Sequence, residues 1–193
     1  NDDSSESDNP ITKTKLSASK SSIIKASQTT TNSDGSTTNI VVNGTALSAT
    51  VKNASGETVS TSKYSISANN KLTLKSIETT QKSVTIPATV TVEGRKYSVT
   101  SIGASAFKGN KTITSVSIGK NVKTIGANAF NKCKKLKSIK LTGKVTSVKK
   151  NAFKNISKNA TIRIKANSKN YKSIKSLIKK SGAPSSTKYK RVK

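Results

Sequence analysis

The sequence contains no histidine, no methionine and no tryptophan, and Cys133 is its single cysteine. A lone cysteine excludes a disulfide within the chain and a cysteine-based metal site. Without histidine the most common general base is missing, and seven of the eight acidic residues lie in the first 80 positions. A single acidic residue in the rest of the chain makes neither a catalytic pair nor a metal site. We therefore expect a protein that is not an enzyme and that binds no cofactor or metal.

Hydrophobic residues are also scarce, at 31% of the chain, and aromatic residues make up only 4%. This is too little for one dense core over 193 residues, and it favours a thin architecture in which each layer buries a narrow strip. No apolar run approaches the ~18 residues that a membrane-spanning helix needs. We interpret the chain as the mature part of an exported protein whose leader has been removed.

The positive charge is concentrated in one half of the chain. Residues 1–80 have a net charge of +1, whereas residues 81–193 have a net charge of +27 and contain Glu93 as their only acidic residue. The sequence therefore joins a nearly neutral half to a strongly basic half.

The neutral half divides into two predicted parts. Residues 1–37 are dominated by Ser, Thr, Asn, Asp and Lys, which predicts a flexible spacer to a membrane or wall anchor; a frayed terminus without a role is the alternative. Residues 38–83 contain short β-type runs separated by turn residues, such as Asn43-Gly44, and predict a small antiparallel β module. Within it, residues 64–74 predict a hairpin around Asn69 and Asn70.

The basic half contains a 23-residue repeat. Phe107, Phe130 and Phe153 are spaced by this period, and an alanine precedes each of them. Other apolar positions recur at the same period: Val99, Val122 and Val145; Ile102, Ile125 and Val148; Ile113 and Leu136, with Asn159 as the polar exception; Val116, Ile139 and Ile162; Ile118, Leu141 and Ile164. Such a period predicts stacked coils, each burying a strip against the next. Within each coil we expect a short strand and a helical or nearly helical return segment that inserts the phenylalanine.

These residues resemble a known repeat family. The run IGANAFNKC at residues 125–133, followed by Leu136 and by IKL at 139–141, resembles the 23-residue BspA-type (Treponema pallidum-type) leucine-rich repeat. The run VTIPATV at residues 84–90 resembles its strand-then-proline signature, followed by a hairpin insertion at Glu93. The resemblance implies a short right-handed solenoid of about three to four coils over residues 84–166. It also implies secretion or display on a bacterial cell surface and a role in attachment, without naming a ligand.

Residues 167–193 predict a capping helix followed by a basic tail. Tyr171, Ile174, Leu177 and Ile178 follow helical spacing, Ser168 is the expected N-cap, and Gly182 and Pro184 end the helix. A terminal coil would otherwise expose its apolar edge, which favours a cap over an amphipathic helix on a membrane surface.

Two groups of cations are the candidate binding residues. On the expected strand ladder, Lys140 and Arg163 share an outward column and Lys165 lies in the next, so the three should cluster. A run on the return side of one coil supplies the second group: Lys132, Lys134, Lys135 and Lys137. Such a surface attracts polyanions, including cell-wall polymers and acidic glycans. The alternative is that the lysines only keep the coils soluble and protect sheet edges.

The sequence thus favours a secreted or surface-anchored bacterial repeat protein that binds a protein or a polyanionic macromolecule of a host or a cell wall. We expect a monomer without sequence-specific nucleic-acid binding, because few aromatic residues remain for base stacking. The second hypothesis is a structural spacer or stalk of a larger surface assembly. We expect Cys133 to be a small buried hydrophobe rather than a reactive thiol.

Overall fold

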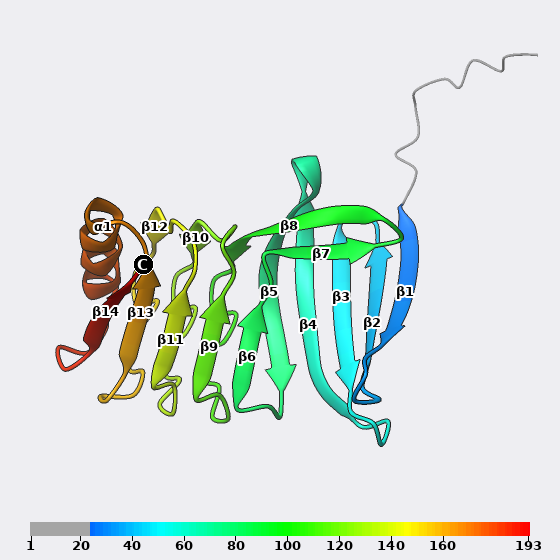
Figure 1. Cartoon of the computed structure of the whole chain (residues 1–193), viewed down its shortest axis with the longest axis horizontal. Helices are drawn as coiled ribbons and strands as arrows, with labels where there is room; N and C mark the ends of the chain where they lie inside the picture. The colour runs from blue at the N-terminus through cyan, green and yellow to red at the C-terminus, as the bar shows by residue number, and fades with distance from the viewer. Residues whose placement is uncertain (1–23) are drawn as a thin grey trace, which may run out of the picture.

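The computed structural model describes residues 24–193, and most of the predicted spacer lies outside this range. An antiparallel meander forms one end of the elongated molecule, coils follow in the middle, and a helix covers the other end (Figure 1). In chain order the elements are β1 (Lys25–Thr31), β2 (Thr37–Asn43), β3 (Ala46–Lys52), β4 (Thr58–Ser67), a 3-10 turn (Ala68–Asn70), β5 (Lys71–Thr79), β6 (Ser83–Ile86), β7 (Thr89–Val92), β8 (Arg95–Ile102), β9 (Ser115–Ile118), β10 (Thr124–Ile125), β11 (Ser138–Leu141), β12 (Ser147–Val148), β13 (Thr161–Lys165), α1 (Ser168–Lys180) and β14 (Lys188–Val192).

The strands form two sheets. The larger sheet has the order β1-β2-β3-β4-β5-β8-β10-β12, with β7 paired to β8, and the smaller has the order β14-β13-β11-β9-β6. Pairing is antiparallel from β1 to β5 and parallel along the path β5-β8-β10-β12. The meander and the coils therefore share one continuous mixed sheet, and the part with the 23-residue repeat is rich in strands.

The meander begins earlier than the sequence predicted. Residues 25–31 form β1 and pair along their length with β2, so the prediction that the spacer extends to residue 37 is wrong for this part. Pairing satisfies the backbone of this polar segment, and its run of β-branched threonines, Thr29 to Thr31, favours an extended chain. The predicted hairpin at residues 64–74 is confirmed, with Tyr64 opposite Leu74 across the turn.

A hairpin insertion ties the coils to the first strand. Strands β7 and β8 pair antiparallel, and Glu93 lies at their turn with a positive φ of 47°. The N–H of Glu93 donates to the side-chain oxygen of Gln28 at 2.7 Å, and the N–H of Ser27 donates to the Glu93 carboxylate at 3.3 Å. The only acidic residue of the basic half is therefore engaged by β1.

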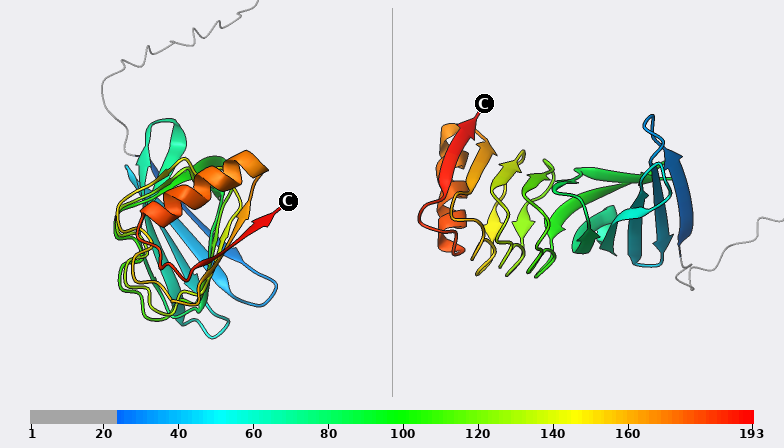
Figure 2. Two further views of the ribbon diagram at one scale, coloured as in Figure 1. Left: turned by 90° about the vertical axis from the view of Figure 1, so that its left-hand side faces the viewer. Right: turned by 90° about the horizontal axis from the view of Figure 1, so that it is seen from below.

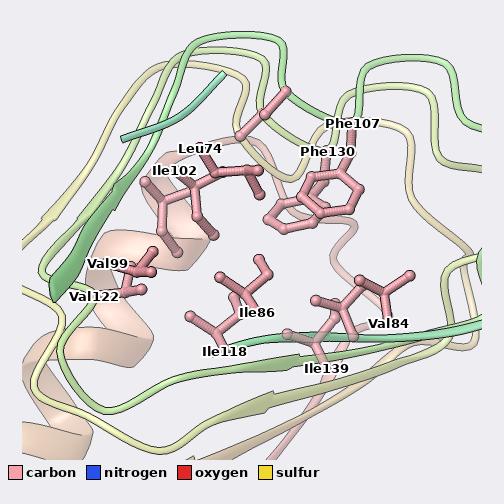
Figure 3. Close-up of a cluster of buried hydrophobic side chains, with 14 of the residues drawn as sticks. Leu74, Val84, Ile86, Val99, Ile102, Phe107, Ile118, Val122, Phe130 and Ile139 are labelled. Atoms are coloured by element: carbon pink, nitrogen blue, oxygen red, sulfur yellow. The ribbon is translucent and has the colours of Figure 1, made fainter. Parts of the chain in front are cut away.

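The coils stack in parallel register at the predicted period. Ile139 of β11 lies opposite Val116 of β9 on one side and Ile162 of β13 on the other, so equivalent residues of successive repeats are paired. A second ladder, β8-β10-β12, repeats the same step on the opposite side of the coil. The predicted inward columns are buried, with Val99 at 0% exposure and Val145 at 3%, except that Val148 at the end of its column is only partly buried. Figure 3 shows neighbouring coils placing Val99 beside Val122 and Ile86 beside Ile118.

The three phenylalanine rings form one column inside the stack. The ring centroids of Phe107 and Phe130 lie 4.8 Å apart, and those of Phe130 and Phe153 lie 5.3 Å apart, with planes 21° and 12° from parallel. The first pair is visible in Figure 3. The N–H of Phe107 donates to the carbonyl of Ala129, and that of Phe130 donates to the carbonyl of Ala152. The prediction that each coil contributes its phenylalanine to an equivalent interior slot is confirmed.

The return segments are turns, and the prediction of helical returns is wrong. In each coil a residue just before the phenylalanine adopts a left-handed conformation: Ser105, Asn128 and Asn151, with φ between 57° and 60°. A second left-handed position follows the phenylalanine: Gly109, Lys132 and Asn155, with φ between 58° and 72°. Because a right-handed helix cannot pass through such residues, the segment folds as consecutive turns whose N–H groups bond to the next coil.

A final coil closes the stack. Helix α1 lies across the end of the coils (Figure 2). Its residues Ile174 and Ile178 are buried. Asn167, rather than the predicted Ser168, is the N-cap, because its side chain accepts the N–H of Asn170 at 2.8 Å. Among residues 24–193, no helix has the length and apolarity needed to cross a bilayer.

The predicted basic tail is instead a strand. Residues 188–192 form β14, which pairs in parallel with β13, so that Tyr189 lies opposite Ile162 and Lys190 opposite Arg163. The step from β13 to β14 is longer than the repeat period, because this coil contains α1. The ammonium of Lys175 lies 5.9 Å from the ring centroid of Tyr171 and 5.4 Å from that of Tyr189, which joins α1 to the new strand.

Candidate functional site

One outward column of the smaller sheet changes from hydroxyl to cationic side chains along the stack. Read from β6 to β14, its register positions are Thr85, Ser117, Lys140, Arg163 and Lys190. Neighbouring strands lie about 4.8 Å apart, so the three cations are adjacent. All three are exposed. We call Lys140, Arg163 and Lys190 the strand-face column.

The charges of the strand-face column have no acidic neighbour within the repeats. Residues 95–193 contain 27 lysines and arginines and no acidic residue. The guanidinium of Arg163 donates instead to the hydroxyl of Ser138, at 3.4 Å. Like charges directly opposite each other on a sheet are destabilising, so this column raises the free energy of the folded protein until an anion neutralises it.

A groove with four cations lies where β11, β13 and β14 end. It has a volume of about 580 Å³, and its lining residues are Thr142, Gly143, Lys144, Lys165, Ala166, Asn167, Asn170, Arg191 and Lys193. Lys165 lies two residues beyond Arg163 on the same exposed face of β13, and it also lines this space at the carboxyl end of the strand. We call this space the carboxyl-end groove. The hydroxyl of Ser168 accepts a hydrogen bond from Arg191 at 2.7 Å, which holds the guanidinium in place.

The return-side lysines lie in a different place. Lys132 and Lys134 line a larger groove of about 960 Å³ together with Lys154, Lys158 and the turn at Gly182 and Pro184. Lys135 and Lys137 are exposed but are not among its lining residues. The seven residues proposed from the sequence therefore do not form one patch. Lys140 and Arg163 belong to the strand-face column, Lys165 to the carboxyl-end groove, and Lys132 and Lys134 to this return-side groove.

Several cations that complete these surfaces were missed in the sequence. They are Lys144, Lys154, Lys158, Lys190, Arg191 and Lys193. Lys154 follows Phe153 directly, and the repeat period could have placed it on the return side, at the position equivalent to Asn131 of the preceding coil. The residues of β14 could not be aligned by that period, because α1 lengthens the last coil.

Sequence comparison decides the family. The model of the BspA-type leucine-rich repeat region matches residues 78–178 in six copies, which is more than half of the chain. The chain belongs to the BspA-type leucine-rich repeat family. Among curated proteins, no sequence matches it.

Solved structures of other repeat proteins resemble this BspA-type chain. A leucine-rich repeat protein from Bacteroides capillosus ATCC 29799 is 26% identical, with a TM-score of 0.52, over 66% of this chain and 93% of that one. A leucine-rich cell surface protein from Faecalibacterium prausnitzii A2-165 is 30% identical, with a TM-score of 0.48, over 52% of this chain. The alignment spans only 28% of the Faecalibacterium protein. The leucine-rich repeat protein of T. pallidum is 19% identical, with a TM-score of 0.43, over 66% of this chain and 60% of that one.

The cysteine of the BspA-type repeats is part of the core. Cys133 is fully buried, and its thiol donates to the carbonyl of Phe107 at 2.9 Å. Burial raises the pKa of the thiol to about 11, with a smaller opposing effect from backbone hydrogen bonds. The prediction that Cys133 is buried is confirmed. Within residues 24–193, no three His, Cys, Asp or Glu side chains gather as a metal site would require.

Proposed function

We propose that this BspA-type repeat protein is displayed on a bacterial cell surface or secreted, and that it binds a polyanionic macromolecule without catalysing a reaction. In this proposal the coils form a short right-handed solenoid that presents the strand-face column to the ligand. The description of the Faecalibacterium relative as a cell surface protein supports the location. The observation that carries the binding proposal is the register of Lys140, Arg163 and Lys190 on three adjacent strands.

The energetics favour a charged ligand over a purely solubilising role for these three side chains. Interspersed charges of both signs are sufficient for a soluble surface, whereas this column places three like charges about 4.8 Å apart. A polyanion that neutralises the column releases its own condensed counterions, and this release drives binding that weakens as salt is added. Ser117 and Thr85 at the same register show that the position accepts uncharged side chains.

The proposal is tested by retention of the full chain on heparin and on isolated bacterial cell wall over a series of salt concentrations. The variant Lys140→Gln/Arg163→Gln/Lys190→Gln should elute at a clearly lower salt concentration than the wild type. The control is Lys172→Gln/Lys179→Gln/Lys180→Gln, which removes the same charge from exposed positions of α1. Equal losses in the two variants would mean that only net charge matters and would contradict a site on the strand face.

A structural spacer is the second candidate function, and one observation favours it. Both ends of the coils are covered, by the meander and by α1, so the described residues form a capped array (Figure 1). A spacer needs no ligand. The absence of retention on both matrices even at low salt would support this function and exclude polyanion binding.

A further inference from the structure

The distribution of arginine points to one part of the basic surface. Of the 36 cationic residues, only three are arginines: Arg95, Arg163 and Arg191. Two of them lie on the adjacent strands β13 and β14. Both are held by a serine hydroxyl, Arg163 by Ser138 and Arg191 by Ser168. Apart from Arg95 of β8, all the other cations are lysines. The two arginines on neighbouring strands therefore indicate a need for a planar guanidinium that a flexible point charge does not meet.

Arg191 differs from Arg163 in what surrounds it. Arg163 lies on the open strand face, in register with Lys190, whereas Arg191 is in register with the inward Ile164. The Arg191 side chain therefore leaves the other side of β14, where it reaches the first residue of α1 and lines the carboxyl-end groove. Lys165 of β13, Lys144 of the turn after β11, and Lys193 line the same groove. Four cations thus surround one concave space.

The polar groups of the groove are mostly donors. The side-chain oxygen of Asn167 already accepts the N–H of Asn170, whereas both of its amide N–H groups are available as donors to a ligand. Ser168 is next to the groove but is not one of its lining residues, and its hydroxyl oxygen accepts a hydrogen bond from Arg191. No acidic residue lines the groove as described over residues 24–193. A cavity lined by four cations, with donors in excess of acceptors, is complementary to a group that carries several acceptor oxygens and negative charge.

We propose that the carboxyl-end groove is a binding site for a tetrahedral oxyanion ester, namely the phosphate group of a phosphate-containing polymer or the sulfate group of a sulfated glycan. This inference rests on the proposed polyanion binding and specifies its second contact. Arg191 binds two oxygens of the oxyanion through its two-pronged guanidinium, and Lys144, Lys165 and Lys193 neutralise the charge. Ser168 is a positioning residue, because it acts on the ligand only through Arg191.

The test uses the full chain and small probes at low ionic strength. Glycerol phosphate, methyl sulfate and acetate are titrated separately, and binding is followed by amide chemical shifts in two-dimensional NMR spectra. We expect saturable shifts at residues of the groove with one of the two tetrahedral probes and only weak, unsaturated shifts with acetate. Stronger binding of glycerol phosphate assigns the site to a phosphate polymer, and stronger binding of methyl sulfate assigns it to a sulfated glycan. Equal affinity for acetate would overturn the proposal.

Variants separate a built site from a general positive potential. Arg191→Lys keeps the charge and should weaken the better tetrahedral probe by about tenfold, because the two-pronged contact is lost. Ser168→Ala should weaken it by a smaller factor, about threefold, by releasing Arg191. Lys180→Gln, at the far end of α1, is the control for lost charge and should leave the affinity unchanged. Unchanged affinity in Arg191→Lys would also overturn the inference.

The two proposals fail in different ways. The variant Lys140→Gln/Arg163→Gln/Lys190→Gln changes the strand face and leaves the residues that line the carboxyl-end groove intact. If this variant keeps wild-type retention on heparin and cell wall while Arg191→Lys loses the small probe, the strand-face proposal fails and the groove stands. If the variant loses retention and no probe binds the wild type, the groove proposal fails alone.

Discussion

The ring of Phe130 stacks on that of Phe107 at 4.8 Å, and its other face lies 5.3 Å from the ring of Phe153. Phe130 is thus the only phenylalanine of this column with an aromatic neighbour on both faces. Aromatic pairs stabilise a core beyond the area that they bury. The middle coil therefore depends on the side chain that both neighbouring coils contact.

Replacing this side chain should be more damaging than replacing the others. We expect Phe130→Ala to lower the free energy of unfolding by about 4 kcal/mol, and Phe107→Ala and Phe153→Ala to lower it by less. Urea unfolding followed by circular dichroism measures the difference. Phe130→Leu, which keeps most of the volume, should lose only part of this amount. Equal losses for the three alanine variants would mean that ring stacking contributes little.

The backbone of Lys132 predicts a stabilising substitution. Lys132 has a φ of 64°, while glycine and asparagine stand at the equivalent positions Gly109 and Asn155. Glycine adopts this conformation without steric cost, so Lys132→Gly should raise the free energy of unfolding by about 1 kcal/mol. Lys134→Gly removes the same charge at a position without a positive φ and should not stabilise. Thermal unfolding of the two variants distinguishes relief of strain from loss of charge.

The raised pKa of Cys133 makes stability depend on alkaline pH. The thiol ionises near 9 in a free chain and near 11 in the folded protein, so its protonated form is favoured by folding. This contribution is fully present below pH 9 and is lost as the pH rises toward 11, by about 2 kcal/mol at pH 10.5. Cys133→Ala should lose less stability than the wild type between pH 7 and pH 10.5 in urea titrations. Parallel losses in both proteins would show that the thiol ionises equally in the folded and unfolded chains.

Uncompensated charge in the coils predicts stabilisation by salt. Raising the ionic strength from about 0.01 M to about 0.15 M shortens the Debye length from about 30 Å to about 8 Å, which weakens the repulsion among the cations. The midpoint of thermal unfolding, Tm, should therefore rise by several degrees. Lys140→Ser, which copies Ser117 of the neighbouring coil, should raise Tm mainly at low salt. Lys63→Ser in the nearly neutral meander should not; an equal effect there would contradict a local origin in the column.

The parts of the fold that a fixed period determines could be predicted from the sequence. Phe107, Phe130 and Phe153 occupy equivalent slots because each coil must bury the same strip, and the valine and isoleucine columns follow for the same reason. Register then placed Lys140 beside Arg163, because parallel strands offset by one period bring equivalent residues together. At these positions the sequence of a single repeat predicts both the burial of a residue and its neighbours in the adjacent coils.

The ends of the molecule could not be predicted in this way. Strand β1 is polar. It is ordered by pairing with β2 and by contact of Gln28 with the turn at Glu93, and neither interaction produces a periodic pattern in the sequence. Strand β14 could not be predicted from the repeat period, because α1 lengthens its coil. Arg191 therefore had no equivalent residue in an earlier repeat with which it could be aligned. The prediction of helical return segments was wrong because left-handed backbone positions in these segments prevent a right-handed helix. The asparagines at 128 and 151 were a signal for these positions.

The closed ends leave the interior of the array as the place where its length can change. A single repeat unit removed or duplicated between β9 and β13 would alter neither the strand β5 that receives the first coil nor the helix that covers the last. Each added unit would lengthen the protein by about 4.8 Å and extend the aromatic column by one ring. Duplication of the unit that carries Lys140 would also add one positive charge to the same line. The length of the protein and the length of the polyanion that its column can contact would therefore change together when a repeat unit is duplicated or deleted.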